Sequence, residues 1–324
     1  MERKFEQPTF VDAAAVELGG PRTTAFLDKC ERLIPWDALA GSIADVFPKP
    51  QKGAVSRVGR PHWPVRLYVK CMMLQKWFGL SDPQLEEQLR DRISFRRFVG
   101  LTMTEATPDE TSMVVFRRRL REAGHERTLF DAVQKHLEKQ GLTLHNGTLV
   151  DATIVEAPRG RKRDDGTSTR DAEASYTKKN DRTYHGYKGH IATDRNGVVK
   201  DFRFDTAKHH DSQYIDDLTK CEKGLVVADS AYMSEEREQR LQKRGVCFGV
   251  VKRRVRGQEE LPHFQQVLNR AWSTVRAIVE HPFAWMRNMG YRRTRYRGLV
   301  RNALDFGLMA AAYNLKRSFS LQSA

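Results

Sequence analysis

The chain has 324 residues, of which 40% are hydrophobic and 30% charged, a composition typical of soluble globular proteins. This length allows one large domain or two of ordinary size. No apolar run approaches the roughly 20 residues that span a bilayer, and the N-terminus lacks the apolar stretch of a signal peptide. We therefore expect a cytoplasmic protein without membrane contact, whose four cysteines remain reduced.

The formal net charge of +15 and the isoelectric point near 9.8 favour a polyanionic partner. A positive field attracts nucleic acid, and binding releases the counterions condensed on its phosphates. A basic protein with no nucleic-acid role is the alternative, and the positions of the basic residues decide between the two.

The first 140 residues have mainly helical signals. Apolar residues three or four apart predict a helix over 63–79, and Ser81 with Gln84 forms a capping box for the next helix. Thr107-Pro-Asp-Glu110 repeats that device, with Pro108 at the first helical position. Glycines end the last two predicted helices, at Gly124 and after Gln140. We expect an all-helical N-terminal domain over 1–140.

Strand signals begin after Gly147, so residues 141–324 are expected to form an α/β domain. Short β-branched runs predict strands at 148–155, 189–194, 198–204, 225–229 and 246–251, with a hairpin turn at Asn196-Gly197. The polar, basic stretch 158–183 predicts a mobile surface loop. Helices are expected over 234–243, 273–286 and 302–316.

Three acidic residues fall on these predicted elements. Asp151 and Asp229 each end the apolar run of a strand, and Glu280 lies beside the apolar stripe of a helix. Three carboxylates suit Mg²⁺ or Mn²⁺ rather than zinc, and two such ions can promote an in-line phosphoryl displacement. Aspartates that cap turns and a solvated glutamate are the simpler interpretation. Arg276 and Arg287 fall along the same helical face as Glu280, which favours phosphate chemistry.

The segment from Asn269 to Phe283, continuing to Arg287, resembles the region of the third acid in bacterial insertion-sequence transposases of the Asp-Asp-Glu (DDE) class. Their signature there is aromatic, Arg, Glu, then basic; this chain has Ser273 at the aromatic position. Further similar segments are Gly59–Pro64, Phe78–Asp82, Thr107–Thr111, Val150–Thr153, Tyr184–His190, Ala207–Ser212, Val227–Tyr232, Arg295–Leu299 and Ala312–Leu315.

The resemblance implies a ribonuclease H-like catalytic domain preceded by a helical domain that binds DNA ends. It also implies that Asp151, Asp229 and Glu280 are catalytic and bind two Mg²⁺ or Mn²⁺ ions. The partners would be double-stranded DNA, as terminal inverted repeats and target, and a second copy of the chain, because two DNA ends must meet. A catalytically inactive DNA-binding descendant and a general ribonuclease H-like nuclease are the alternatives.

Several basic residues are candidates for DNA contact, with a solvated surface as the alternative in each case. They are Arg276, Arg287, Arg292, Arg293, Arg295 and Arg297 near the C-terminus, Lys252, Arg253 and Arg254 before them, and Arg117 and Arg118 in the helical domain. Lys188, His209 and His210 are candidate accessory residues of the site. We expect the histidines to form hydrogen bonds or contact phosphate rather than to coordinate zinc.

Overall fold

The computed structural model describes residues 2–3, 7, 21–47, 61–161, 163–179, 181–252, 254 and 260–322. The chain forms two compact units, Met1–His136 and Leu137–Ala324, which are described one at a time. Gly59 and Arg60, which belong to one of the similar segments, lie outside the described residues. Within the described part, no helix is long and apolar enough to cross a membrane.

The first unit is helical, as the sequence predicts. Its elements are α2 (Pro21–Leu33), α3 (Trp36–Gly41), η2 (Ala44–Val46), α4 (Val65–Phe78), α5 (Asp82–Asp91), α6 (Ile93–Val99), α7 (Glu110–Glu122) and the first part of α8 (Thr128–Lys139). Helix α4 is the centre of this unit, because every side chain from Leu67 to Trp77 is buried.

One of the two predicted helix caps is confirmed and the other is wrong. Ser81 and Gln84 form the expected capping box, in which the Ser81 amide donates to Gln84 Oε1 at 2.9 Å. Helix α7, however, is capped by Asp109 and not by Thr107. The Asp109 carboxylate accepts from the Ser112 amide at 2.6 Å, so the helix begins two residues later than predicted.

The second unit is built on a six-stranded mixed sheet. Its strands are β1 (Thr148–Glu156), β2 (Ser175–Lys179), β3 (Arg182–Thr193), β4 (Val199–Thr206), β5 (Leu225–Ala228) and β6 (Cys247–Val250). Strand β3 pairs antiparallel with β1, β2 and β4, whereas β5 pairs parallel with β1 and β6. An antiparallel β1–β3–β4 group extended by two parallel strands is the expected ribonuclease H-like arrangement.

The stretch 158–183 is not the continuous loop that its composition predicts. Residues Ser175–Lys179 form β2, and β3 begins at Arg182. Strand β2 was missed because it is a polar edge strand with no buried residue, so it lacks the alternation of apolar and polar residues that reveals a half-buried strand.

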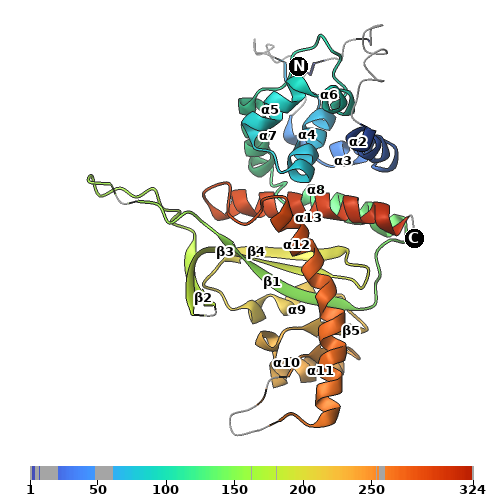
Figure 1. Cartoon of the computed structure of the whole chain (residues 1–324), viewed down its shortest axis with the longest axis vertical. Coiled ribbons are helices and arrows are strands. Elements are labelled where there is room, and N and C mark those ends of the chain that lie inside the picture. Colours follow the sequence, from blue (N-terminus) through green and yellow to red (C-terminus); the bar gives the residue numbers. More distant parts are fainter. Residues whose placement is uncertain are drawn as a thin grey trace. The chain divides into compact units, whose positions relative to one another are not determined.

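Helices cover both faces of the sheet (Figure 1). Val150, Ala192 and Val226 point to one face and pack in a core with Ile215 and Leu241, which belong to α9 (Ile215–Leu218) and α10 (Glu235–Lys243). The opposite face is covered by α11 (His263–Arg276), α12 (Glu280–Asn288) and α13 (Leu299–Leu321). Two glycines on that face let the helices pack close to the sheet, because they have no side chain. Gly249 lies beneath Trp272 of α11, and Gly189 lies beneath Phe306 of α13.

Two predicted C-terminal helices differ from the structure. The helix expected over 273–286 is the end of α11, a 3₁₀ turn η5 (Ala277–Val279) and most of α12. The last helix, expected over 302–316, runs from Leu299 to Leu321.

Candidate active site

Asp151 lies inside β1, within the strand predicted over 148–155. The strand continues five residues beyond it, to Glu156, but burial falls after Val150. Asp151 pairs with Ile191 of β3 and therefore points to the face covered by α11–α13. Its side chain is 17% exposed.

Asp229 directly follows β5, where the sequence places it, and caps the 3₁₀ turn η4 (Ser230–Tyr232). Its Oδ1 accepts from the Ser230 amide at 2.6 Å. The parallel register matches Thr148 with Val226 and Leu149 with Val227. Continuing that register by two residues brings Asp229 beside Asp151, on the same face of the sheet.

Glu280 reaches this face from the helical layer. It is the first residue of α12, directly after the turn η5, and η5 packs against β1 and β3. The Glu280 side chain is 58% exposed. A buried Val279 anchors the turn, so the adjacent Glu280 is held at the rim of the sheet.

Arg276 links the acids. Its Nη2 lies 3.5 Å from Asp151 Oδ2 and 3.9 Å from Glu280 Oε1, while its Nε is buried without a hydrogen-bond partner among the described residues. Burial raises the pKa of Asp151, Arg276 opposes that rise, and the charges of Asp229 and Glu280 add to it. The three acids therefore share one electrostatic neighbourhood.

The donor set suits a hard divalent cation, since it consists of three carboxylates whose mutual repulsion a cation would relieve. In the described part of the chain, however, no three His, Cys, Asp or Glu side chains are already gathered as a metal site. The positive charge beside Asp151 and Glu280 is the Arg276 guanidinium. The chemistry of the residues fits Mg²⁺ or Mn²⁺, and binding requires the acids to draw closer together.

Tyr232 is a residue of this neighbourhood that sequence reasoning did not single out. It ends η4, three residues after Asp229, and its side chain is fully buried with no hydrogen-bond partner for the hydroxyl in the described residues. Burial raises its pKa, and the charges of Asp211, Asp151 and Asp229 raise it further. The signal was its fixed spacing from Asp229, which places it in the same turn.

The candidate accessory residues lie in a second polar cluster. Lys188 pairs with Ile154 in the β1–β3 register, so it points away from the face of Asp151. It forms an ion pair with Asp211 at 2.8 Å and donates to the His209 carbonyl oxygen at 3.0 Å. His209 contacts Asp205 at 2.8 Å, whereas the exposed His210 caps the turn η3 (Asp211–Gln213) through the Ser212 amide. None of these contacts reaches the three acids directly.

The cluster also contains two residues that the prediction did not include. Tyr214 donates to Asp205, and its ring lies 4.6 Å from that of His190. His190 is fully buried with both ring nitrogens unpaired among the described residues, and this burial lowers its pKa to about 4. His190 is therefore a neutral, packed side chain at physiological pH, and within the described part of the chain it lacks the hydrogen bonds that were expected of the histidines.

The candidate DNA-contacting residues fall into three groups. Arg287, Arg292, Arg293 and Arg297 are exposed, and Arg295 is half-buried. Lys252 and Arg254 are exposed beside α11, whereas Arg253 lies outside the described residues. In the helical unit Arg118 is exposed and lies 3.7 Å from Glu122.

The predicted DNA contact of Arg117 is wrong. Its side chain is only 7% exposed and forms an ion pair with Asp82, so it stabilises the contact between α7 and the start of α5. The three consecutive arginines 117–119 looked alike in sequence, but the helical period turns Arg117 inward and Arg118 outward. A DNA contact by Arg117 is not supported.

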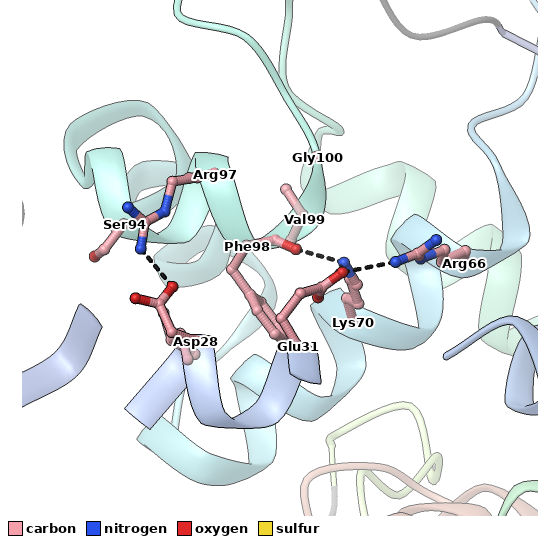
Figure 2. Close-up of a pocket in the computed structure, with 10 residues that line it drawn as sticks. Asp28, Glu31, Arg66, Lys70, Ser94, Arg97, Phe98, Val99 and Gly100 are labelled. Atoms are coloured by element: carbon pink, nitrogen blue, oxygen red, sulfur yellow. Dashed lines mark hydrogen bonds and ion pairs between the residues drawn. The ribbon is translucent and has the colours of Figure 1, made fainter. Parts of the chain in front are cut away.

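The helical unit holds a pocket of about 310 Å³, whose lining includes none of the three acids. Figure 2 shows that its charged side chains face one another: Arg97 reaches Asp28, and Lys70 reaches Glu31 and the carbonyl oxygen of Phe98. Burial lowers the pKa of Lys70, while Glu31 opposes that change. Because acids neutralise these cations, the pocket is lined by a largely solvent-exposed ion-pair network, in which only Lys70 of these four side chains is buried, and it does not suit a phosphate.

The second unit has a ribonuclease H-like fold, and the three acids lie on the face of its sheet that α11–α13 cover. Residues 143–315 match the family described as "Transposase DDE domain", and residues 20–119 match "Transposase domain (DUF772)". The chain therefore belongs to the DDE-domain transposases, and it carries the two domains expected of one.

A cryo-electron microscopy structure of a piggyBac transposase synaptic complex with hairpin DNA is similar over 88% of this chain and 72% of that one, at 11% identity and a TM-score of 0.46. At that score the likeness carries no weight for function.

Proposed function

We propose that this transposase cleaves DNA at the ends of its own element and joins the freed end to target DNA, with Asp151, Asp229 and Glu280 as the catalytic residues. The observation that supports the proposal is that the three acids lie on one face of the sheet, where Arg276 contacts both Asp151 and Glu280. The acids come from β1, the end of β5 and the start of α12, elements that are far apart in sequence.

Asp151, Asp229 and Glu280 would hold two Mg²⁺ or Mn²⁺ ions. Such ions, when bound, supply positive charge that activates the attacking oxygen and stabilises the leaving oxygen. Arg276 contacts the acids themselves, so we assign it as a positioning residue. The exposed Arg287 remains a candidate for holding a DNA phosphate.

The reaction consists of two balanced displacements at phosphorus. In the first, water attacks a phosphodiester at the element's end, and the bond to the 3′-oxygen breaks, which leaves a 3′-hydroxyl and a 5′-phosphate. In the second, this 3′-hydroxyl attacks a phosphodiester of the target, and the target's own 3′-oxygen leaves. Protons move from each attacking oxygen to solvent and from solvent to each leaving oxygen.

The helical unit is proposed to bind the DNA ends, with Arg118 as the exposed candidate on α7. A dimer or higher assembly is proposed because two ends have to be held together. Light scattering of the full chain, alone and with a duplex that carries one end, tests the assembly: a complex with a single chain and a single end at every ratio would contradict it.

The test of the chemistry is a nicking assay with Mg²⁺ on a duplex that carries the inverted repeats flanking the gene. Asp151→Asn, Asp229→Asn and Glu280→Gln should each abolish cleavage while binding to the duplex persists. The matched control is Glu236→Gln, because Glu236 is an exposed acid of α10 in the same unit. Full cleavage by Asp151→Asn would refute the assignment.

The same assay separates the alternatives. A wild-type chain that binds the ends but never cuts them would be a DNA-binding descendant of a transposase. Equal cutting of cognate and scrambled ends would indicate a general nuclease.

A further inference from the structure

The segment between β1 and β2 forms a projecting hairpin. The Arg163 amide donates to the Thr167 carbonyl oxygen at 2.8 Å, and the Thr169 amide to the Arg161 carbonyl oxygen at 3.0 Å. We call residues 159–161 and 163–170 the finger. Figure 1 shows this green to yellow-green segment extending away from the sheet.

The base of the finger has a defined geometry. Gly160 has a φ of +64°, and a Cβ at this position would come 2.5 Å from the Arg170 amide nitrogen. The Arg170 Nε donates to the Arg159 carbonyl oxygen at 2.9 Å, which holds the two arms together. At the tip, Asp165 accepts from the Thr167 amide at 2.8 Å. The finger is therefore a hydrogen-bonded element, although its composition is that of a loop.

The finger presents positive charge to solvent, and the side chains of two of its four described arginines make no internal contact. Arg159, Arg161, Arg163 and Arg170 are all exposed, and the acids Asp164 and Asp165 are confined to the tip. The side chains of Arg161 and Arg163 form no hydrogen bond or ion pair with any described residue. The arms carry no large apolar side chain, so the finger does not contribute to a hydrophobic core.

The finger is continuous with the arginine-rich segment 292–297. Glu156, the last residue of β1, forms a β-bridge with Arg293 and accepts from the Thr294 amide at 2.9 Å. A pocket of about 220 Å³ is lined both by the finger's base and by that segment, through Gly160, Thr169, Arg295 and Arg297. Two separate basic stretches of the sequence thus form one surface.

We propose that the finger and residues 292–297 together grip the phosphate backbone of duplex DNA that is bound at the three acids. This inference rests on the proposed function. Strand β1 leads directly from Asp151 to the finger, and the five residues from Asp151 to Glu156 span about 16 Å. At about 3.4 Å per base pair, this distance corresponds to about five base pairs for a duplex that runs along the strand.

The chemistry of the surface also indicates how the DNA is read. Guanidinium groups that contact phosphates position the duplex but carry no sequence information. The finger therefore holds target or flanking DNA of any sequence, while recognition of the element's ends belongs elsewhere in the chain.

The experiment compares the full-length wild type with an Arg161→Gln/Arg163→Gln double variant. Fluorescence anisotropy follows binding to 30-base-pair duplexes with cognate or scrambled sequence, in EDTA, from 50 to 200 mM salt. The salt slope is the change of the logarithm of the binding constant with the logarithm of the salt concentration. Loss of two phosphate contacts should lower its magnitude by about 1.8, so the ratio of wild-type to variant affinity should fall about tenfold between 50 and 200 mM salt. The loss should be equal on both duplexes.

The matched control is Lys220→Gln/Lys223→Gln, which removes the same charge from two exposed residues. These lysines flank Glu222, whose carboxylate binds the start of β1, so they lie at the end of the strand opposite the finger. The control should leave the salt slope within about 0.3 of the wild type. An unchanged slope in the finger variant, or an equal loss in the control, would overturn the proposal.

The outcome is independent of the catalytic assignment. Binding is measured without divalent cations, so a wild-type chain that fails to cut DNA would sink the proposed chemistry and leave the finger result standing. A loss confined to the cognate duplex would instead make the finger a sequence-reading element and would also overturn the inference.

Discussion

Glu222 joins the two strands that position Asp151 and Asp229, the aspartates proposed to be catalytic. Its carboxylate is almost fully buried and accepts from the Gly147 amide at 3.1 Å, the Thr148 hydroxyl at 2.5 Å and the Gly224 amide at 2.8 Å. Lys200 adds an ion pair at 3.1 Å. These contacts join the start of β1 to the start of β5, so we predict that Glu222→Gln loosens both strands.

The size of the effect follows from the pKa of Glu222. Burial acts to raise this pKa, but the hydrogen bonds from Thr148 and the backbone amides, together with Lys200, outweigh it and lower the pKa to about 2. A carboxylate whose folded pKa is depressed contributes stability above its unfolded pKa and loses it as pH falls through the folded value. Relative to an ordinary value of 4.5, this contribution is about 3 kcal/mol at neutral pH.

Hydrogen exchange followed by mass spectrometry measures the stability of β1 and β5 locally. The measurement does not require both units to unfold together. At pH 7, peptides from β1 and β5 should exchange roughly 100-fold faster in Glu222→Gln than in the wild type. The difference should shrink toward pH 3. The control Glu235→Gln, an exposed acid at the start of α10, should change exchange less than threefold. Unchanged protection of β1 and β5 in Glu222→Gln would refute the reasoning.

Three further predictions concern single residues. Asp151→Asn should unfold at a higher temperature than the wild type in EDTA at pH 8, and the difference should shrink toward pH 4. The reason is that a carboxyl whose folded pKa is raised destabilises the fold once it ionises. A lower melting temperature of the variant at pH 8 would contradict this. Gly189→Ala should lose about 1–3 kcal/mol in urea unfolding, because the new methyl group meets the Phe306 ring, and a neutral effect would show that α13 can move aside. Arg117→Met should lower the free energy of unfolding by about 3 kcal/mol, because Asp82 loses its buried ion-pair partner. The salt slope of DNA binding should stay unchanged, and a reduced slope would show that Arg117 does contact a phosphate.

The sequence was most informative where periodicity and spacing carry the structure. The Asn196-Gly197 turn and the strands β1, β3, β4, β5 and β6 follow from alternating or apolar runs between turn residues. The same runs placed Asp229 at the end of its strand. They also predicted β1 to within one residue of its observed end, with Asp151 inside the strand.

Contacts between distant elements were beyond the reach of sequence reasoning. Arg276 was expected to hold a phosphate, but it lies between Asp151 and Glu280, which depends on how η5 packs against the sheet. The finger and residues 292–297 are more than 120 residues apart, so their shared surface depends on the bridge between Glu156 and Arg293. Helical phase decides that Arg117 is buried, and a run of three arginines does not reveal that phase.

The parallel register of β1 and β5 limits where the chain can accept insertions or deletions. A shift of one residue in β1 would move Asp151 into the apolar core beneath α9 and α10 and would bring Val150 or Ala152 to the acids instead. A single-residue insertion or deletion between Gly147 and Asp151 would therefore preserve a sheet but eliminate catalysis. Insertions at the finger's tip, near Gly166, leave every strand in phase, so the evolutionary freedom of this domain lies in that hairpin and not in the strand that precedes it.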